Sequence, residues 1–162
     1  MSLGAICIVL WIAVFTLGCL TAKNRRGIGR EVFVLATNGL VFLQLVALAL
    51  LDIYSESLQA LGLFSLFSVI VIFWSAFTGY MLARVAVSYV LGAIGKRVFG
   101  LLAIIPIANL MLAILPISSP RKWRLRPTLR LLIATLGALT LNVATGIGFL
   151  VPAMTSGWRL FA

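Results

Sequence analysis

The sequence predicts an all-α protein, a polytopic bundle of transmembrane helices that forms a single integral membrane domain over residues 1–162. Three observations support this prediction. The chain is 63% hydrophobic, with a mean hydropathy of +1.21. Its apolar runs approach or exceed the roughly 20 residues that cross a hydrocarbon core of about 30 Å. Its Lys and Arg residues are clustered between these runs. Together these features exclude a soluble domain.

The basic clusters predict the orientation of the helices, because Lys and Arg concentrate on the cytoplasmic side of membrane spans. All but one of the 13 basic residues fall into three clusters. The clusters are Lys23, Arg25, Arg26 and Arg30; Arg84, Lys96 and Arg97; and Arg121, Lys122, Arg124, Arg126 and Arg130. The third cluster is expected to contact anionic lipid headgroups, which are the nearest counterions of a basic membrane protein. No nucleic-acid partner is expected for the same reason.

Three apolar runs follow one another with consistent charges at their ends. The first span is predicted from about Leu3 to Ala22 and leads inward to the first cluster. No basic residue precedes it, so we expect an uncleaved span and not a signal peptide. The second span, Glu31 to Leu51, leads outward to a loop at Asp52–Glu56 that holds two acids and no base. The third, Leu61 to Ala83, leads inward to the second cluster. The segment Val85–Leu91 either extends this span or lies along the interface.

The fourth apolar run departs from the pattern, because basic clusters flank both of its ends. A full crossing would place the third cluster outside. The run contains Pro106, Asn109 and Pro116, and proline inside a helix removes a hydrogen bond and favours a break. Two interpretations compete: four spans plus a re-entrant or kinked helical hairpin near 98–117, or five spans. The charges favour the hairpin. The last span is expected from about Leu129 to Val151.

The broken segment is also where a ligand site is expected, if the protein has one. Pro106, Asn109 and Pro116 are its candidate residues. The run Ile105–Leu110 is similar to Ile-Pro-x-x-Asn segments of small bacterial membrane proteins. This resemblance covers a few residues and implies no activity.

The sequence offers few groups for catalysis. It contains no histidine, which removes the usual general base and the commonest metal ligand. Asp52 and Glu56 are expected to be solvated outer charges, and Glu31 to favour the dipole at the start of the second span. Cys7 and Cys19 would lie about 18 Å apart along one helix, too far for a disulfide. No catalytic residue, metal ligand or cofactor is therefore predicted.

Small residues at four-residue spacing predict helix-packing interfaces. One row is Ser75, Gly79 and Ala83; the other is Ala134, Ala138, Asn142 and Gly146. Such rows let helix backbones approach closely, and an amide can hydrogen-bond across the contact. The partner is either another helix of this chain or another subunit. Asn38 and Gln44 lie about 120° apart on their helix, so we expect them to form hydrogen bonds between helices instead of lining one polar path.

These observations favour a non-catalytic integral membrane subunit, or an assembly or stabilising factor, of a larger membrane protein complex. Its partners would be other membrane protein subunits and anionic lipids. The alternative is a small oligomeric transporter or channel with its site at the Pro106/Asn109 helix break. The expected location is the bacterial inner membrane, with several spans and the basic loops in the cytoplasm.

Overall fold

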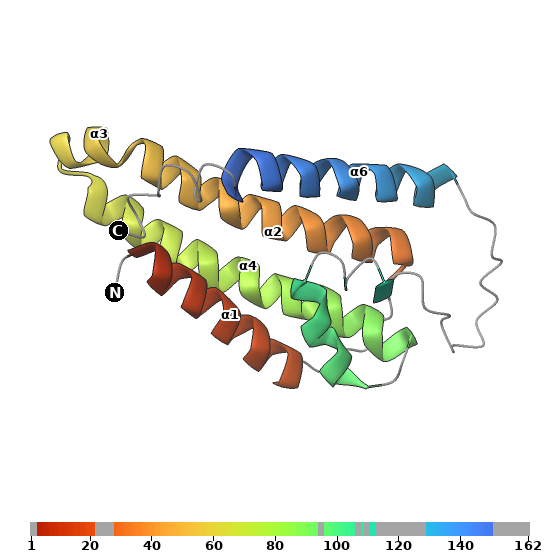
Figure 1. Ribbon diagram of the computed structural model, residues 1–162. Helices are drawn as coiled ribbons and strands as arrows, with labels where there is room; N and C mark the ends of the chain where they lie inside the picture. The colour runs from red at the N-terminus through yellow and green to blue at the C-terminus, as the bar shows by residue number, and fades with distance from the viewer. Residues whose placement is uncertain are drawn as a thin grey trace.

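The computed structural model describes residues 3–21, 28–93, 96–105, 108, 111–112 and 129–150. Within these residues the chain is helical and contains no strand, which confirms the all-α class. The long helices are α1 (Leu3–Thr21), α2 (Arg30–Ile53), α4 (Phe64–Ala93) and α6 (Leu129–Thr145). The short elements are α3 (Ser55–Ala60), the 3₁₀ helix η1 (Arg97–Ile104) and the π helix η2 (Gly146–Leu150). The long helices lie side by side as a bundle (Figure 1).

The helices α1, α2 and α4 are each long and apolar enough to cross a membrane. The chain is therefore an integral membrane protein. The apolar stretch of α6, Leu132–Gly148, is shorter and continues into η2. Both ends of α1 and the start of α6 agree with the sequence prediction to within one residue. The start of α2 does so as well.

Each helix has a defined direction in the bundle. α1 and α4 are parallel, α2 and α6 are parallel, and α2 runs antiparallel to α4 (Figure 1). α1 packs mainly on α4, whereas α2 lies between α4 and α6. The first basic cluster precedes α2, and the acidic residues of the α2–α3 segment lie at the opposite end of that helix. We call the end of the bundle where α2 and α6 begin the basic end.

The predicted outer loop at Asp52–Glu56 is wrong, because this segment is helical. α2 continues to Ile53, and the short helix α3 follows after a single turn residue. The reversal comes later, at Gly62, whose φ of 68° lies in the left-handed region that glycine adopts without strain. The Leu63 amide donates to the Leu58 carbonyl at 2.8 Å, which closes α3 with a Schellman-type cap.

The helix of the third predicted span does not end at Ala83, because α4 continues to Ala93. The extra turns contain no glycine or proline before Gly92, so nothing in the sequence breaks the helix. Their inner face is fully buried through Ala86, Val87 and Val90. Of the two alternatives for Val85–Leu91, the structure shows the one in which these residues extend the helix of the third span. Arg84 consequently lies inside a helix.

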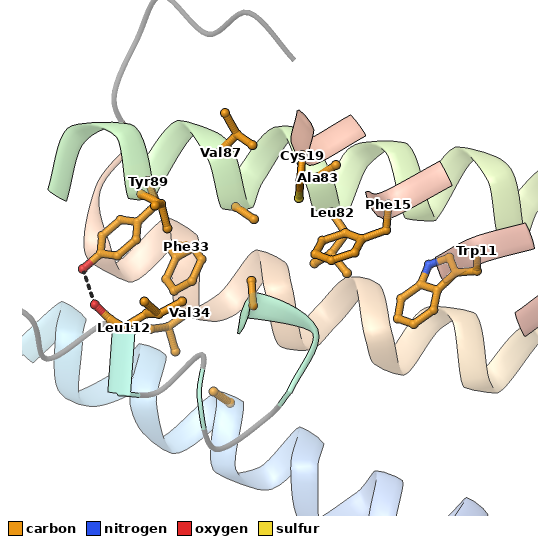
Figure 2. Packing of buried hydrophobic residues seen from close by; sticks show 14 residues of the cluster. Trp11, Phe15, Cys19, Phe33, Val34, Leu82, Ala83, Val87, Tyr89 and Leu112 are labelled. Carbon is orange, nitrogen blue, oxygen red and sulfur yellow. Dashed lines mark hydrogen bonds between the residues drawn. The ribbon is translucent and has the colours of Figure 1, made fainter. Parts of the chain in front are cut away.

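The main hydrophobic core runs along the contact of α1, α2 and α4 towards the basic end. Phe15 and Leu82 fill its centre, and Phe33 and Tyr89 fill it near the basic end (Figure 2). A smaller buried cluster around Leu48 lies towards the other end of the bundle. The bundle therefore has a continuous packed interior, and the polar groups described next are set into it.

Candidate functional site

A polar network joins α2 to α4 inside the bundle. The side-chain amide of Gln44 donates to Ser75 Oγ at 2.8 Å, and Thr78 Oγ1 donates to Gln44 Oε1 at 2.9 Å. The Ser75 hydroxyl in turn donates to the Val71 carbonyl at 2.8 Å. Gln44, Ser75 and Thr78 are all buried. Both polar atoms of the Gln44 amide are thus bonded to α4, and the network acts as a cross-link between the two helices.

A second amide contact joins α2 to α6. Asn142 Nδ2 donates to Asn38 Oδ1 at 2.8 Å, and Asn38 Nδ2 donates to the Val34 carbonyl of its own helix at 2.7 Å. Ala134 and Ala138, which precede Asn142 in the same row, are almost fully buried. The structure therefore places these three members of the α6 row against α2. Asn38 and Gln44 thus both form bonds between helices, and their partners lie on two different helices, α6 and α4.

The row on α4 faces α1. A Cβ atom added to Gly79 would lie 2.7 Å from the backbone oxygen of Trp11, so only glycine fits this contact. A Cβ added to Gly18 of α1 would lie 2.6 Å from the Ala83 Cβ. Ser75, the first member of the row, is fully buried. Gly79 and Ala83 thus lie where the backbones of α1 and α4 approach closely, and Ser75 also bonds Gln44 of α2.

Other residues singled out in the sequence lie elsewhere. Gly146, the last member of the α6 row, has open space around the position of an added Cβ. Arg130 belongs to the first turn of α6, but its side chain lies outside the described residues. Also outside them are the broken-segment candidates Pro106, Asn109 and Pro116 and the lipid-contact candidates Arg121, Lys122, Arg124 and Arg126.

Beyond α4 the chain folds back against the bundle. The helix η1 packs on both α4 and α1. A Cβ added to Gly100 would lie 3.5 Å from Cys19 Sγ and 3.6 Å from Val87 Cγ2, and Ala103 is fully buried. At Ile105 the backbone becomes extended, with φ −91° and ψ 117°, and η1 ends.

The other end of this segment is held by Tyr89. Its hydroxyl donates to the Leu112 carbonyl at 3.1 Å, and its ring stacks on Phe33 with centroids 4.2 Å apart (Figure 2). Gly100 and Leu112 therefore lie close to the same turn of α4, at Val87 and Tyr89. We call the described residues within 97–112 the return segment. Tyr89 was not among the residues predicted from the sequence, where its only signal was an aromatic hydroxyl next to Ser88 in an apolar stretch.

The described residues do not gather into a metal site, since no three His, Cys, Asp or Glu side chains among them lie close enough to hold an ion. Cys7 and Cys19 are free and buried in α1. No protein-family model matches the chain, and no curated protein or solved structure matches it either.

Proposed function

We propose that the protein is a non-catalytic integral membrane subunit, or a stabilising factor, of a larger membrane protein complex. The observation that carries the proposal is that the interior polar side chains form hydrogen bonds between helices. Gln44, Ser75 and Thr78 bond one another between α2 and α4, and Asn38 bonds Asn142 between α2 and α6. These groups hold helices together. The chain also has no histidine, the residue that most often acts as a general base in catalysis.

The topology that we propose has four spans and a re-entrant return segment. Its support is the pair of contacts at Val87 and Tyr89, which place Gly100 and Leu112 beside α4 near the basic end. All three basic clusters would then lie on one side, which the positive-inside rule identifies as the cytoplasm of a bacterial inner membrane. The third cluster would meet anionic headgroups there.

The test of the subunit function is gentle detergent extraction from the native membrane, followed by native mass spectrometry. We expect this chain to be released with a different protein at fixed stoichiometry. Recovery of only monomers or homo-oligomers of this chain would overturn the proposal. If the complex is recovered, its dissociation in the gas phase should release this intact chain and a second protein that can be identified by its mass.

A second candidate function, a small oligomeric transporter or channel, is favoured by the extended backbone at Ile105. Helices interrupted within the membrane form the binding sites of many carriers. The test is reconstitution in liposomes with fluorescence-detected flux of monovalent ions. Asn109→Ala should change the flux, and Thr140→Ala on the exposed face of α6 should not. Flux no faster than that of empty liposomes would argue against a transporter or channel of these ions.

A further inference from the structure

The 3₁₀ helix η1 lies over the end of the contact between α1 and α4. Cys19 of α1 is fully buried, although its neighbour Leu20 is 51% exposed. A Cβ atom added to Gly100 of η1 would lie 3.5 Å from Cys19 Sγ and 3.8 Å from the backbone of Ala86 in α4. The backbone of η1 therefore shields the thiol of Cys19 on one side.

η1 turns its smallest residues towards the bundle. A 3₁₀ helix has three residues per turn, so Gly100 and Ala103 lie on one face of it. Both residues are buried, and we call them the seat of η1. The larger apolar side chains of η1 are exposed or only partly buried; they are Val98, Phe99, Leu101, Leu102 and Ile104. Because glycine and alanine bury little apolar surface, the seat contributes less free energy than a face of leucine or phenylalanine would.

The backbone of η1 is also a weak element. The hydrogen bonds of a 3₁₀ helix have poorer geometry than those of an α-helix, and runs longer than three or four residues are uncommon. η1 contains 8 residues, Arg97–Ile104, and ends where Ile105 becomes extended. Segments with few buried contacts and weak backbone bonds open locally at a lower free energy than the packed helices around them. η1 is therefore the element of the described fold that is best suited to separate from the bundle.

A tie at Tyr89 holds the chain beyond η1. The Tyr89 hydroxyl donates to the Leu112 carbonyl at 3.1 Å and also bonds Arg30 at the start of α2 (Figure 2). Tyr89 and Leu112 are both buried. The same turn of α4 contains Val87, which lies beside the seat of η1. The return segment is thus held to one turn of α4 by a seat of small residues and by Leu112 with its single hydrogen bond.

We propose that η1 is a strap that opens over the α1–α4 contact while the long helices stay packed, and that the bond from Tyr89 to Leu112 favours its closed position. The structure shows the closed position. The close contacts of α1 with α4 at Trp11 and Gly18 do not involve η1, so α1 stays docked when the strap opens. Opening then exposes Cys19, whereas Cys7 remains buried in the other hydrophobic cluster. The two cysteines of α1 therefore report separately on opening of the strap and on unfolding of the bundle.

The experiment measures how fast N-ethylmaleimide, which crosses membranes, reacts with each cysteine of the full chain in its native membrane. Peptide mass spectrometry after timed quenching gives the two rates. Tyr89→Phe should raise the rate at Cys19 about fivefold, the factor that corresponds to a typical neutral hydrogen bond, and leave the rate at Cys7 unchanged. Leu20→Cys in a chain with Cys19→Ser gives the rate of an unshielded thiol at the same depth.

Two further variants make the test specific to the strap. Gly100→Ala should lower the rate at Cys19 about two- to fivefold, because the new methyl group makes ordinary contacts with Cys19 and Val87 and alanine restricts the opened chain. Arg30→Met keeps the Tyr89 hydroxyl and its bond to Leu112, so it should raise the rate at Cys19 less than Tyr89→Phe does. Carbonate extraction shows that each variant is inserted in the membrane.

Three results would overturn the inference. The first is a rate at Cys19 that Tyr89→Phe leaves unchanged. The second is a rise at Cys7 that matches the rise at Cys19, because the bundle would then open as a whole. The third is a rise with Arg30→Met as large as that with Tyr89→Phe, because the tie would then be made by the arginine and not by Leu112. A rise confined to Cys19, reversed in direction by Gly100→Ala, is the result that the strap predicts.

Discussion

The side-chain amides of Asn38 and Asn142 are joined by a hydrogen bond of 2.8 Å, although the two residues are 104 positions apart in the chain. This bond connects the second and the last long helices in a parallel arrangement. Leu35 and Gly137 meet in the same register, since a Cβ added to Gly137 would lie 3.3 Å from Leu35 Cδ2. The two contacts fix both the direction and the register of α6 on α2.

Replacement of Asn142 by Leu should destabilise the packing of α6 on α2, because Asn38 Oδ1 then loses its donor. We expect a cost of about 1 kcal/mol, typical of an interhelical hydrogen bond in a membrane. A double-mutant cycle with Asn38→Leu, followed by unfolding in mixed micelles, measures the coupling. Thr140→Val is the control, since Thr140 is exposed and bonds its own helix at Leu136. Coupling near zero would show that the amide bond contributes nothing.

Gly79→Ala should destabilise the protein, because the new Cβ would lie 2.7 Å from the Trp11 oxygen and α1 would have to move. The expected loss is about 1–3 kcal/mol of unfolding free energy. Gly39→Ala is the matched control in α2, where an added Cβ meets nothing within 4 Å. That substitution should stabilise its helix by about 0.5–1 kcal/mol. Equal effects at the two sites in an unfolding titration would contradict the close contact.

Tyr89→Phe should loosen the return segment, because it removes the hydroxyl that donates to the Leu112 carbonyl and also bonds Arg30, while it keeps the ring on Phe33. A loss of about 1 kcal/mol is expected for a neutral hydrogen bond. Thermal unfolding in detergent measures it against Tyr54→Phe, an exposed tyrosine at the far end of α2. A melting temperature equal to that of the control variant would show that the bond does not hold the segment.

Cysteine labelling in intact cells tests the proposed topology. In a chain with Lys122→Cys, an impermeant maleimide added outside should not react, because the four-span arrangement keeps the third cluster in the cytoplasm. The native Cys7 and Cys19 are buried and should stay unlabelled until the protein is unfolded in SDS, which provides an internal control. A cysteine in place of the exposed Gln59 beside Gly62 should react. Outside labelling at position 122 would establish five spans.

Hydropathy and charge predicted the spans that are bounded by both signals. Leu3 and Leu129 mark real helix starts, because an apolar run begins there next to a polar or basic segment. The same reasoning failed at Arg84, which the prediction took as a boundary. A single Arg is accommodated within α4 because Tyr80 supplies an acceptor and a π face one turn away. Sequence alone does not separate such a residue from one at the interface.

The internal contacts were predictable in part. The 120° between Asn38 and Gln44 indicated contacts between helices and not one polar path, because helix geometry is local. Which helices they meet depends on the whole topology, and the partners Asn142 and Ser75 lie far along the chain. The bond from Tyr89 to Leu112 was unpredictable for the same reason. It depends on a chain reversal that no local pattern specifies.

The parallel pairing of α1 with α4 has a consequence for biogenesis. A ribosome delivers α1 and α2 to the membrane before α4 has been synthesised, and α1 packs mainly on α4. The glycine-lined contact between Trp11 and Gly79 can therefore form only after the third long helix has inserted. Until then the N-terminal helix must remain in the lipid, or beside an insertion factor, without its principal partner. Assembly of this small protein is thus ordered by synthesis, and its first helix is among the later ones to dock.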